Sequence, residues 1–171
     1  MAGHIFLTGK KRIGKTTVLK KVLSGYPEQI GGFFTVRTRE FLKDAYSVHL
    51  FRPEEEPVPN KENLLFVCGR PDRDMEERFE NLGVQALRRS SGCALILMDE
   101  LGPHEASAIL FRRAVLELLE GDVPILGVLQ APADRYWPEA SGHPKVQVIE
   151  ITEENRDQEE LLAKIRARLL L

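Results

Sequence analysis

The sequence predicts an α/β domain in which a mostly parallel sheet is flanked by helices. Short apolar, β-branched runs alternate along the chain with helical stripes, a pattern typical of parallel sheets. A loop rich in glycine and lysine separates the first apolar run from the first helical stripe. The 171 residues are an ordinary length for one domain, so we expect residues 1–171 to form a single unit.

The first strand and the first helix are predicted on either side of that loop. The strand is expected at 4–8, where an apolar run suits a buried position in a sheet. The helix is expected at 15–25, because apolar residues recur at i, i+4 between Val18 and Leu23 and the stripe ends at Gly25.

The later elements continue the alternation. Runs 31–39 and 45–51 are separated by a short segment without a helical pattern, which predicts a β-hairpin beside the parallel sheet. Residues 52–63 are rich in prolines and carboxylates and are expected to form an exposed loop. The remaining strands are expected at 64–68, 94–98, 124–129 and 146–151. The remaining helices are expected at 72–90, 104–120 and 155–169.

Residues 9–17 match the pattern G-x-x-x-x-G-K-[ST] of a phosphate-binding loop. Its glycines let backbone amides turn toward phosphate oxygens, and the N-terminus of the following helix favours anions. Lys15 is expected to bind the β- and γ-phosphates and to act in catalysis, while the Thr16 hydroxyl is expected to ligate Mg²⁺. The predicted nucleotide-binding residues of the loop are Gly9, Lys10, Lys11, Arg12, Ile13, Gly14, Lys15, Thr16 and Thr17.

Two carboxylates, Asp99 and Glu100, follow the apolar run of the strand predicted at 94–98. Open α/β sheets bind ligands at the carboxyl ends of their strands, so both side chains are expected near the phosphate loop. We expect Asp99 to hold Mg²⁺ together with Thr16, and Glu100 to orient or deprotonate an attacking water. This pair therefore favours water as the acceptor of the γ-phosphoryl group.

Charge and composition argue against several other classes of function. The formal net charge of −2 provides neither a basic surface for nucleic acid nor a polybasic patch for a membrane. We find no signal-peptide pattern and no apolar run of membrane-spanning length, and we expect a cytoplasmic protein whose ligand is a nucleoside triphosphate. Cys68 and Cys93 lie in or beside apolar stretches and are expected to be reduced, buried thiols.

Four stretches of the chain resemble the family of small P-loop nucleoside-triphosphatases, which has human and thermophile members. They are the phosphate loop, 32–35 with Arg39, 98–102 with Glu105, and 151–157. The resemblance implies a P-loop NTPase fold with a small β-hairpin. It also implies Mg²⁺-dependent hydrolysis of ATP, GTP, CTP and UTP to the diphosphate and phosphate, with little preference for the base.

The charge that develops on a transferred γ-phosphoryl group is usually neutralised by a cation in addition to the loop lysine. The resemblance favours Arg39 for this catalytic role, because it matches the arginine of the family. The other candidates are Lys11, Arg12, Arg37, Arg135 and Arg156.

Asn155 has two interpretations. With Gln158 it forms a capping-box pattern at the start of the helix predicted at 155–169. Its place in the stretch 151–157 implies instead that this loop passes the nucleotide base, with Asn155 as a binding residue.

Two alternatives to hydrolysis stay open. A nucleoside or nucleotide kinase would use the same phosphate cradle to pass the γ-phosphoryl group to a second substrate. A slow nucleotide-dependent switch would use hydrolysis to reset an interface with a partner.

Overall fold

One seven-stranded sheet organises the computed structural model, which describes residues 3–171. Its strand order is β4-β3-β2-β5-β6-β1-β7. The strands are β1 (His4–Thr8), β2 (Ile30–Thr38), β3 (Ser47–Phe51), β4 (Leu64–Val67), β5 (Leu95–Leu101), β6 (Ile125–Leu129) and β7 (Val146–Glu150).

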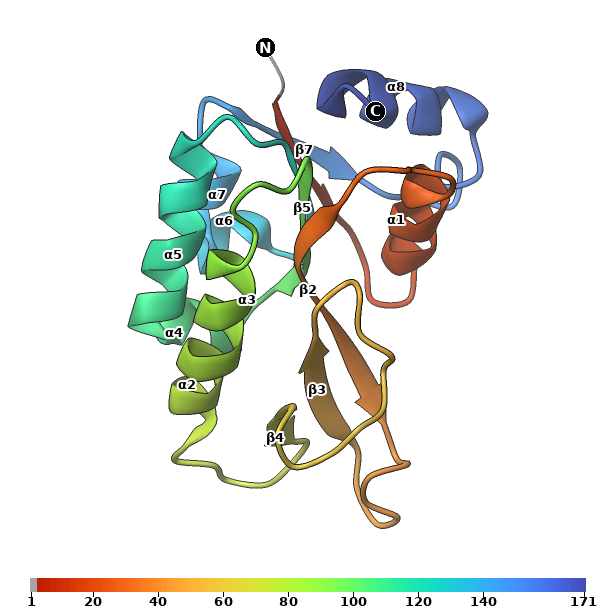
Figure 1. Cartoon of the computed structure of the whole chain (residues 1–171). Coiled ribbons are helices and arrows are strands. Elements are labelled where there is room, and N and C mark those ends of the chain that lie inside the picture. Colours follow the sequence, from red (N-terminus) through yellow and green to blue (C-terminus); the bar gives the residue numbers. More distant parts are fainter. Residues whose placement is uncertain (1–2) are drawn as a thin grey trace.

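The sheet has a parallel part and an antiparallel extension. Neighbours from β2 to β7 in the spatial order pair in parallel, and β6 lies between β1 and β5. β3 pairs antiparallel with β2, which confirms the predicted hairpin, and β4 adds a further antiparallel strand. The first half of β2, up to Phe33, pairs with β5. Its second half, from Phe34 to Thr38, extends beyond that pairing and forms the hairpin with β3 (Figure 1).

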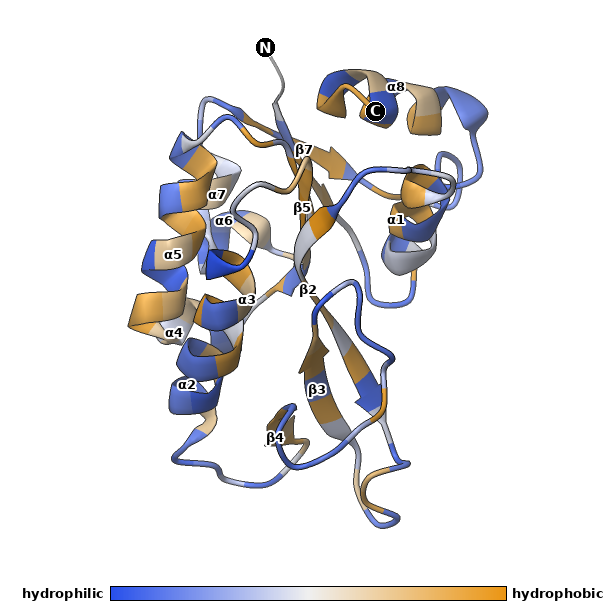
Figure 2. Ribbon diagram, in the orientation of Figure 1, coloured by the Kyte–Doolittle hydropathy of each residue, from blue (hydrophilic) through white to orange (hydrophobic). Residues whose placement is uncertain are grey.

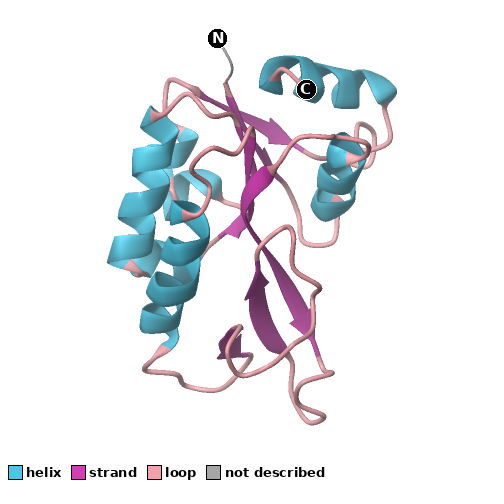
Figure 3. Cartoon of the chain, in the orientation of Figure 1, coloured by secondary structure: helices cyan, strands magenta, loops and turns pink. Residues whose placement is uncertain are grey.

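Helices cover both faces of the sheet, with α1 and α8 on one side and the others opposite (Figure 3). A π-helical segment, Phe79–Gly83, joins α2 to α3. The helices are α1 (Lys15–Leu23), α2 (Met75–Arg78), α3 (Val84–Arg88), α4 (Pro103–Ser107), α5 (Ile109–Glu120), α6 (Ala133–Tyr136), α7 (Pro138–Ser141) and α8 (Glu159–Leu169).

Two apolar layers fix these helices to the sheet, as the orange strands in Figure 2 indicate. Along β1, Phe6 faces the layer under α3, α5 and α7, while Ile5 and Leu7 face the layer under α1 and α8. Central strands that are buried on both faces need continuous apolar runs, which is why these segments were recognisable in the sequence.

Three predicted helices differ from the structure, two in where they begin and one in its continuity. The helix expected at 72–90 begins at Met75 and contains the π-helical segment, whereas the one expected at 155–169 begins at Glu159. The helix expected at 104–120 is interrupted at Ala108, whose extended backbone separates α4 from α5. At the break the Leu110 amide donates to Glu80 Oε1 (3.2 Å), a contact between remote segments that local periodicity does not encode.

The end of β5 and the two cysteines also differ in part from the predictions. β5 continues through Asp99 and Glu100 to Leu101, past the predicted end at 98. Cys93 is buried as predicted, while Cys68 is half-buried, and both are free thiols. Within 3–171, we find no helix of the length and apolar character needed to cross a membrane. Residues 1–2 of the predicted domain lie outside the described part.

Candidate nucleotide-binding and catalytic site

The phosphate loop joins β1 to α1, and two of its glycines adopt positive φ. Gly9 has φ of 140° and Gly14 has φ of 113°, both in the region that favours glycine. A Cβ atom on Gly9 would lie 2.7 Å from the Ile151 carbonyl oxygen, so the close approach of the β7–α8 loop also requires glycine. Arg12 adopts φ of 61° between these two positions.

Positive charge surrounds the N-terminus of α1. The first turn of α1 has no acidic residue, and Lys10, Lys11 and Arg12 are exposed. Thr16 and Thr17 are also exposed, which leaves their hydroxyls accessible. A helix N-terminus with free amides, flanked by cations, is a site for a phosphate group.

The Lys15 side chain folds back onto the phosphate loop. Its Nζ donates to the carbonyl oxygens of Gly9 (2.9 Å) and Lys10 (2.7 Å). Burial lowers the pKa of Lys15, while the carboxylates of Glu100 and Asp99 raise it. Burial is the larger effect, so the pKa of Lys15 lies below its ordinary value.

Asp99 is a buried carboxyl, only 8% exposed. Burial and the neighbouring Glu100 raise its pKa to about 6, against the opposing effects of Lys20, a hydrogen bond with the Thr35 backbone and Lys15. Burial and a like charge therefore outweigh the nearby positive charge at Asp99, and its role as a Mg²⁺ ligand stays a prediction.

Glu100 is held in a strained backbone conformation. It has φ of 70°, which is uncommon for a residue other than glycine and costs about 1–3 kcal/mol. The pairing of β5 with β6 shifts register between Met98 and Leu101, so the strain coincides with an irregularity in the sheet. The side chain is exposed while its neighbours Asp99 and Leu101 are buried. The strand therefore presents Glu100 to solvent at the edge where the phosphate loop lies.

Contacts on both sides of Gly102 support the segment that follows. We define residues 99–105 as the β5–α4 junction. The buried Gly102 donates its amide to Glu105 Oε2 (2.9 Å), and its carbonyl accepts from Trp137 Nε1 (2.9 Å). Burial raises the pKa of Glu105 to about 7, with a smaller contribution from Glu100, although hydrogen bonds from backbone amides oppose the rise. Either charge state keeps an oxygen that can accept from Gly102.

Arg39 and Arg156, two candidates for the additional cation, lie in different surroundings. Arg39 follows β2, and its guanidinium lies 4.4 Å from the centre of the Tyr46 ring, on which Arg37 also stacks. Arg156, by contrast, donates from Nη1 to the Ile13 carbonyl (3.1 Å). Of these arginines it is thus Arg156 that the structure places in contact with the phosphate loop, while a catalytic role for Arg39 stays a prediction.

Asn155 stabilises a turn between β7 and α8. Its Oδ1 accepts from the Thr152 amide (2.8 Å), and its Nδ2 donates to the Glu150 carbonyl (2.8 Å). The predicted capping box is wrong, because α8 begins at Glu159 and Gln158 occupies the capping position without a side-chain cap. The turn lies next to the phosphate loop, because the Ile151 carbonyl approaches Gly9. A contact between Asn155 and the nucleotide base stays a prediction.

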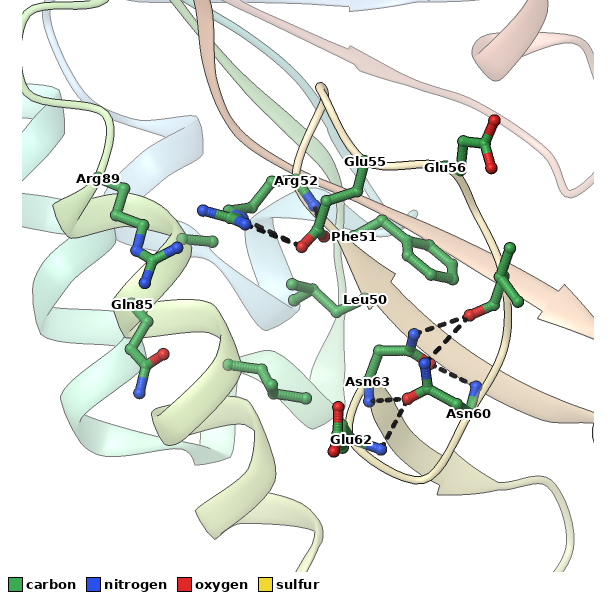
Figure 4. A pocket seen from close by; sticks show the side chains of 13 residues that line it. Leu50, Phe51, Arg52, Glu55, Glu56, Asn60, Glu62, Asn63, Gln85 and Arg89 are labelled. Carbon is green, nitrogen blue, oxygen red and sulfur yellow. Dashed lines mark hydrogen bonds and ion pairs between the residues drawn. The ribbon is translucent and has the colours of Figure 1, made fainter.

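Two cavities differ in their relation to this site. One of about 530 Å³ lies beside the phosphate loop, where Gly9, Lys10 and Pro132 contribute to its wall. The other, of about 380 Å³, lies between the 52–63 loop and α3 (Figure 4). In the second cavity Arg52 pairs with Glu55. The first cavity is therefore the one that adjoins the predicted nucleotide site.

The phosphate loop and the two carboxylates lie on nearby parallel strands of one sheet. A phosphate loop follows β1, paired carboxylates lie near the end of β5, and only β6 separates these two parallel strands. These features define a P-loop α/β domain that binds nucleotides.

Comparison with known proteins gives the family. Residues 4–165 match a family described as NTPase, and the chain belongs to it. Nucleoside-triphosphatase THEP1 of Methanosarcina acetivorans is 31% identical over 185 residues, covering 98% of this chain and 97% of that protein. The predicted resemblance is confirmed.

Solved structures confirm the P-loop NTPase fold. The crystal structure of THEP1 from Aquifex aeolicus is similar with a TM-score of 0.73 at 22% identity, covering 97% of this chain and 98% of the other. The solution structure of a human cancer-related nucleoside triphosphatase has a TM-score of 0.62 at 28% identity, covering 97% and 96%.

Proposed function

We propose that this protein hydrolyses nucleoside triphosphates to the diphosphate and phosphate, with little preference among ATP, GTP, CTP and UTP. The observation that carries the proposal is geometric: the phosphate loop follows β1, and Asp99 and Glu100 lie near the end of β5, with only β6 between these parallel strands. Relatives named nucleoside-triphosphatases over nearly the whole chain support it.

The reaction assigns a separate task to each group. The water oxygen attacks the γ-phosphorus while Glu100 accepts a proton from that water. The bond between the γ-phosphorus and the bridging oxygen breaks, and its electron pair leaves with the nucleoside diphosphate. Lys15 and the amides at the start of α1 stabilise the negative charge on the phosphate oxygens.

Mg²⁺ belongs to the proposal because the donors fit it. The exposed hydroxyl of Thr16 and the buried carboxyl of Asp99 are oxygen ligands of the kind that Mg²⁺ prefers. When bound, the ion would offset charge on the β- and γ-phosphates.

Binding that relies on phosphates explains the expected tolerance for bases. The cationic residues of the loop act on the triphosphate, which all four substrates share. Asn155, the predicted binding residue beyond the phosphate loop, already uses both ends of its amide in the turn. We therefore expect affinity to depend little on the base.

Tracing the γ-phosphate tests the proposal against its kinase alternative. Purified protein is incubated with a γ-labelled triphosphate and Mg²⁺, with and without added nucleoside monophosphates. We expect the label that leaves the triphosphate to appear only in inorganic phosphate under both conditions. When a chelator removes Mg²⁺, we expect no label to leave the triphosphate. Label on an added nucleoside monophosphate would instead establish a kinase.

A further inference from the structure

We propose that Glu105 and Trp137 are positioning residues that hold Glu100 in its catalytic orientation by clamping Gly102. This proposal rests on the proposed function, in which Glu100 takes the proton of the attacking water. Neither residue needs to touch the nucleotide. Both would act through the backbone of the β5–α4 junction.

The clamp restrains both polar groups of a single buried residue. Glu105 Oε2 accepts from the Gly102 amide at 2.9 Å, and Trp137 Nε1 donates to the Gly102 carbonyl at 2.9 Å. Glu105 is 8% exposed and Trp137 is 0% exposed, so water cannot easily replace either contact. Gly102 is thereby fixed against α4 on one side and the start of α7 on the other.

Two observations connect this clamp to Glu100. Glu100 has φ of 70°, a conformation that persists only where the surroundings impose it. The intervening Leu101 is itself restrained, because its carbonyl accepts from the Gln130 amide (2.9 Å) at the end of β6. With Leu101 and Gly102 both fixed, the strained turn at Glu100 has no freedom to relax toward an ordinary strand.

A local explanation for Glu105 also exists, and it makes a different prediction. Glu105 lies in the first turn of α4, so its contact with Gly102 resembles an ordinary helix cap. A cap would affect stability alone. It also does not explain Trp137, which approaches Gly102 from a position 35 residues away in the chain.

Steady-state and single-turnover hydrolysis with ATP and Mg²⁺ test the clamp, at a temperature well below each variant's unfolding transition. Glu105→Ala removes the acceptor, and Trp137→Phe keeps an aromatic ring but removes the N–H donor. We expect each to lower kcat by about tenfold to a hundredfold while KM changes by less than about threefold. Glu105→Gln retains an oxygen acceptor and should keep kcat within about threefold of wild type.

Several outcomes decide the matter. If Glu105→Ala and Trp137→Phe both keep wild-type kcat, the clamp has no role in turnover and the proposal is overturned. If Glu105→Ala does not fold, Trp137→Phe alone gives the answer. A fall caused by Glu105→Gln as large as that caused by Glu105→Ala also overturns it. If wild-type protein releases no phosphate, or Glu100→Gln is as active as wild type, the failure belongs to the proposed function.

Discussion

The phosphate loop and the β5–α4 junction serve one site but acquire their shapes in different ways. The loop takes its conformation largely from its own sequence, since Gly9 and Gly14 adopt the φ values that its curl requires. The junction depends on remote partners, with Trp137 bound to Gly102 and Gln130 bound to Leu101. Local sequence thus builds the part that binds phosphate, whereas tertiary contacts build the part that positions Glu100.

This contrast predicts different kinds of defect. Changes in the loop should weaken nucleotide binding, because the loop supplies the charges and amides that contact phosphate. Changes in the junction should slow turnover while leaving binding nearly intact, because the junction sets the orientation of Glu100.

Within the loop, the largest effect is expected from Lys15→Ala. Loss of the ammonium should lower kcat/KM by about 10²–10³-fold and weaken the binding of a non-hydrolysable triphosphate. Lys164→Ala, which removes an exposed lysine from α8, is the matched control and should behave as wild type. Near-normal hydrolysis by Lys15→Ala would remove the phosphate loop from the site.

Glu105→Gln, in the junction, should change how the free energy of unfolding depends on pH. The Glu105 pKa rises from its ordinary 4.5 to about 7 in the folded protein, a gap that corresponds to about 3 kcal/mol. Below pH 4.5 the acid is protonated in both states. As the pH rises toward 7, the unfolded chain ionises first, so wild type loses stability that Glu105→Gln keeps.

Denaturant unfolding of both proteins between pH 4 and pH 8 measures this difference. The advantage of Glu105→Gln should grow with pH up to about 7 and then become constant. A difference in unfolding free energy that stays flat over this range would show that Glu105 is not buried as an acid.

Gly9→Ala tests whether the loop depends on close backbone approach. The new Cβ would lie 2.7 Å from the Ile151 carbonyl oxygen, so we expect a loss of about 1–3 kcal/mol in unfolding free energy together with weaker triphosphate binding. Gly92→Ala is the control, because Gly92 also has positive φ but no atom within 4 Å of the added Cβ. It should lose about 1 kcal/mol and bind normally. Equal effects of the two changes on binding would contradict the steric explanation.

The smallest effect is expected from the base of the substrate. Values of kcat/KM for ATP, GTP, CTP and UTP should agree within about tenfold, or about 1.4 kcal/mol. A preference of about a thousandfold for one base would reveal a specific pocket, and the cavity beside Lys10 and Pro132 would be its first candidate.

The same contrast explains what the sequence could predict. The phosphate loop, the strand and helix on either side of it, and the hairpin follow from glycine spacing and apolar periodicity, which are local signals. The break at Ala108 and the bond from Trp137 to Gly102 could not be predicted, because both involve contacts between segments distant in the chain. The late start of α8 was missed because Asn155 imitates a helix cap while it stabilises a separate turn.

A comparison of Glu100→Gln with wild type decides whether Glu100 accepts the proton of the attacking water. The glutamine keeps size and hydrogen-bonding reach but loses the basic carboxylate. Glu76→Gln, at an exposed position in α2, controls for the loss of one negative charge. Single-turnover hydrolysis of ATP and binding of a non-hydrolysable triphosphate are measured on all three proteins. We predict that Glu100→Gln binds within about threefold of wild type and hydrolyses about 10²–10⁴-fold more slowly. Hydrolysis within about threefold of wild type would show that Glu100 does not activate the water.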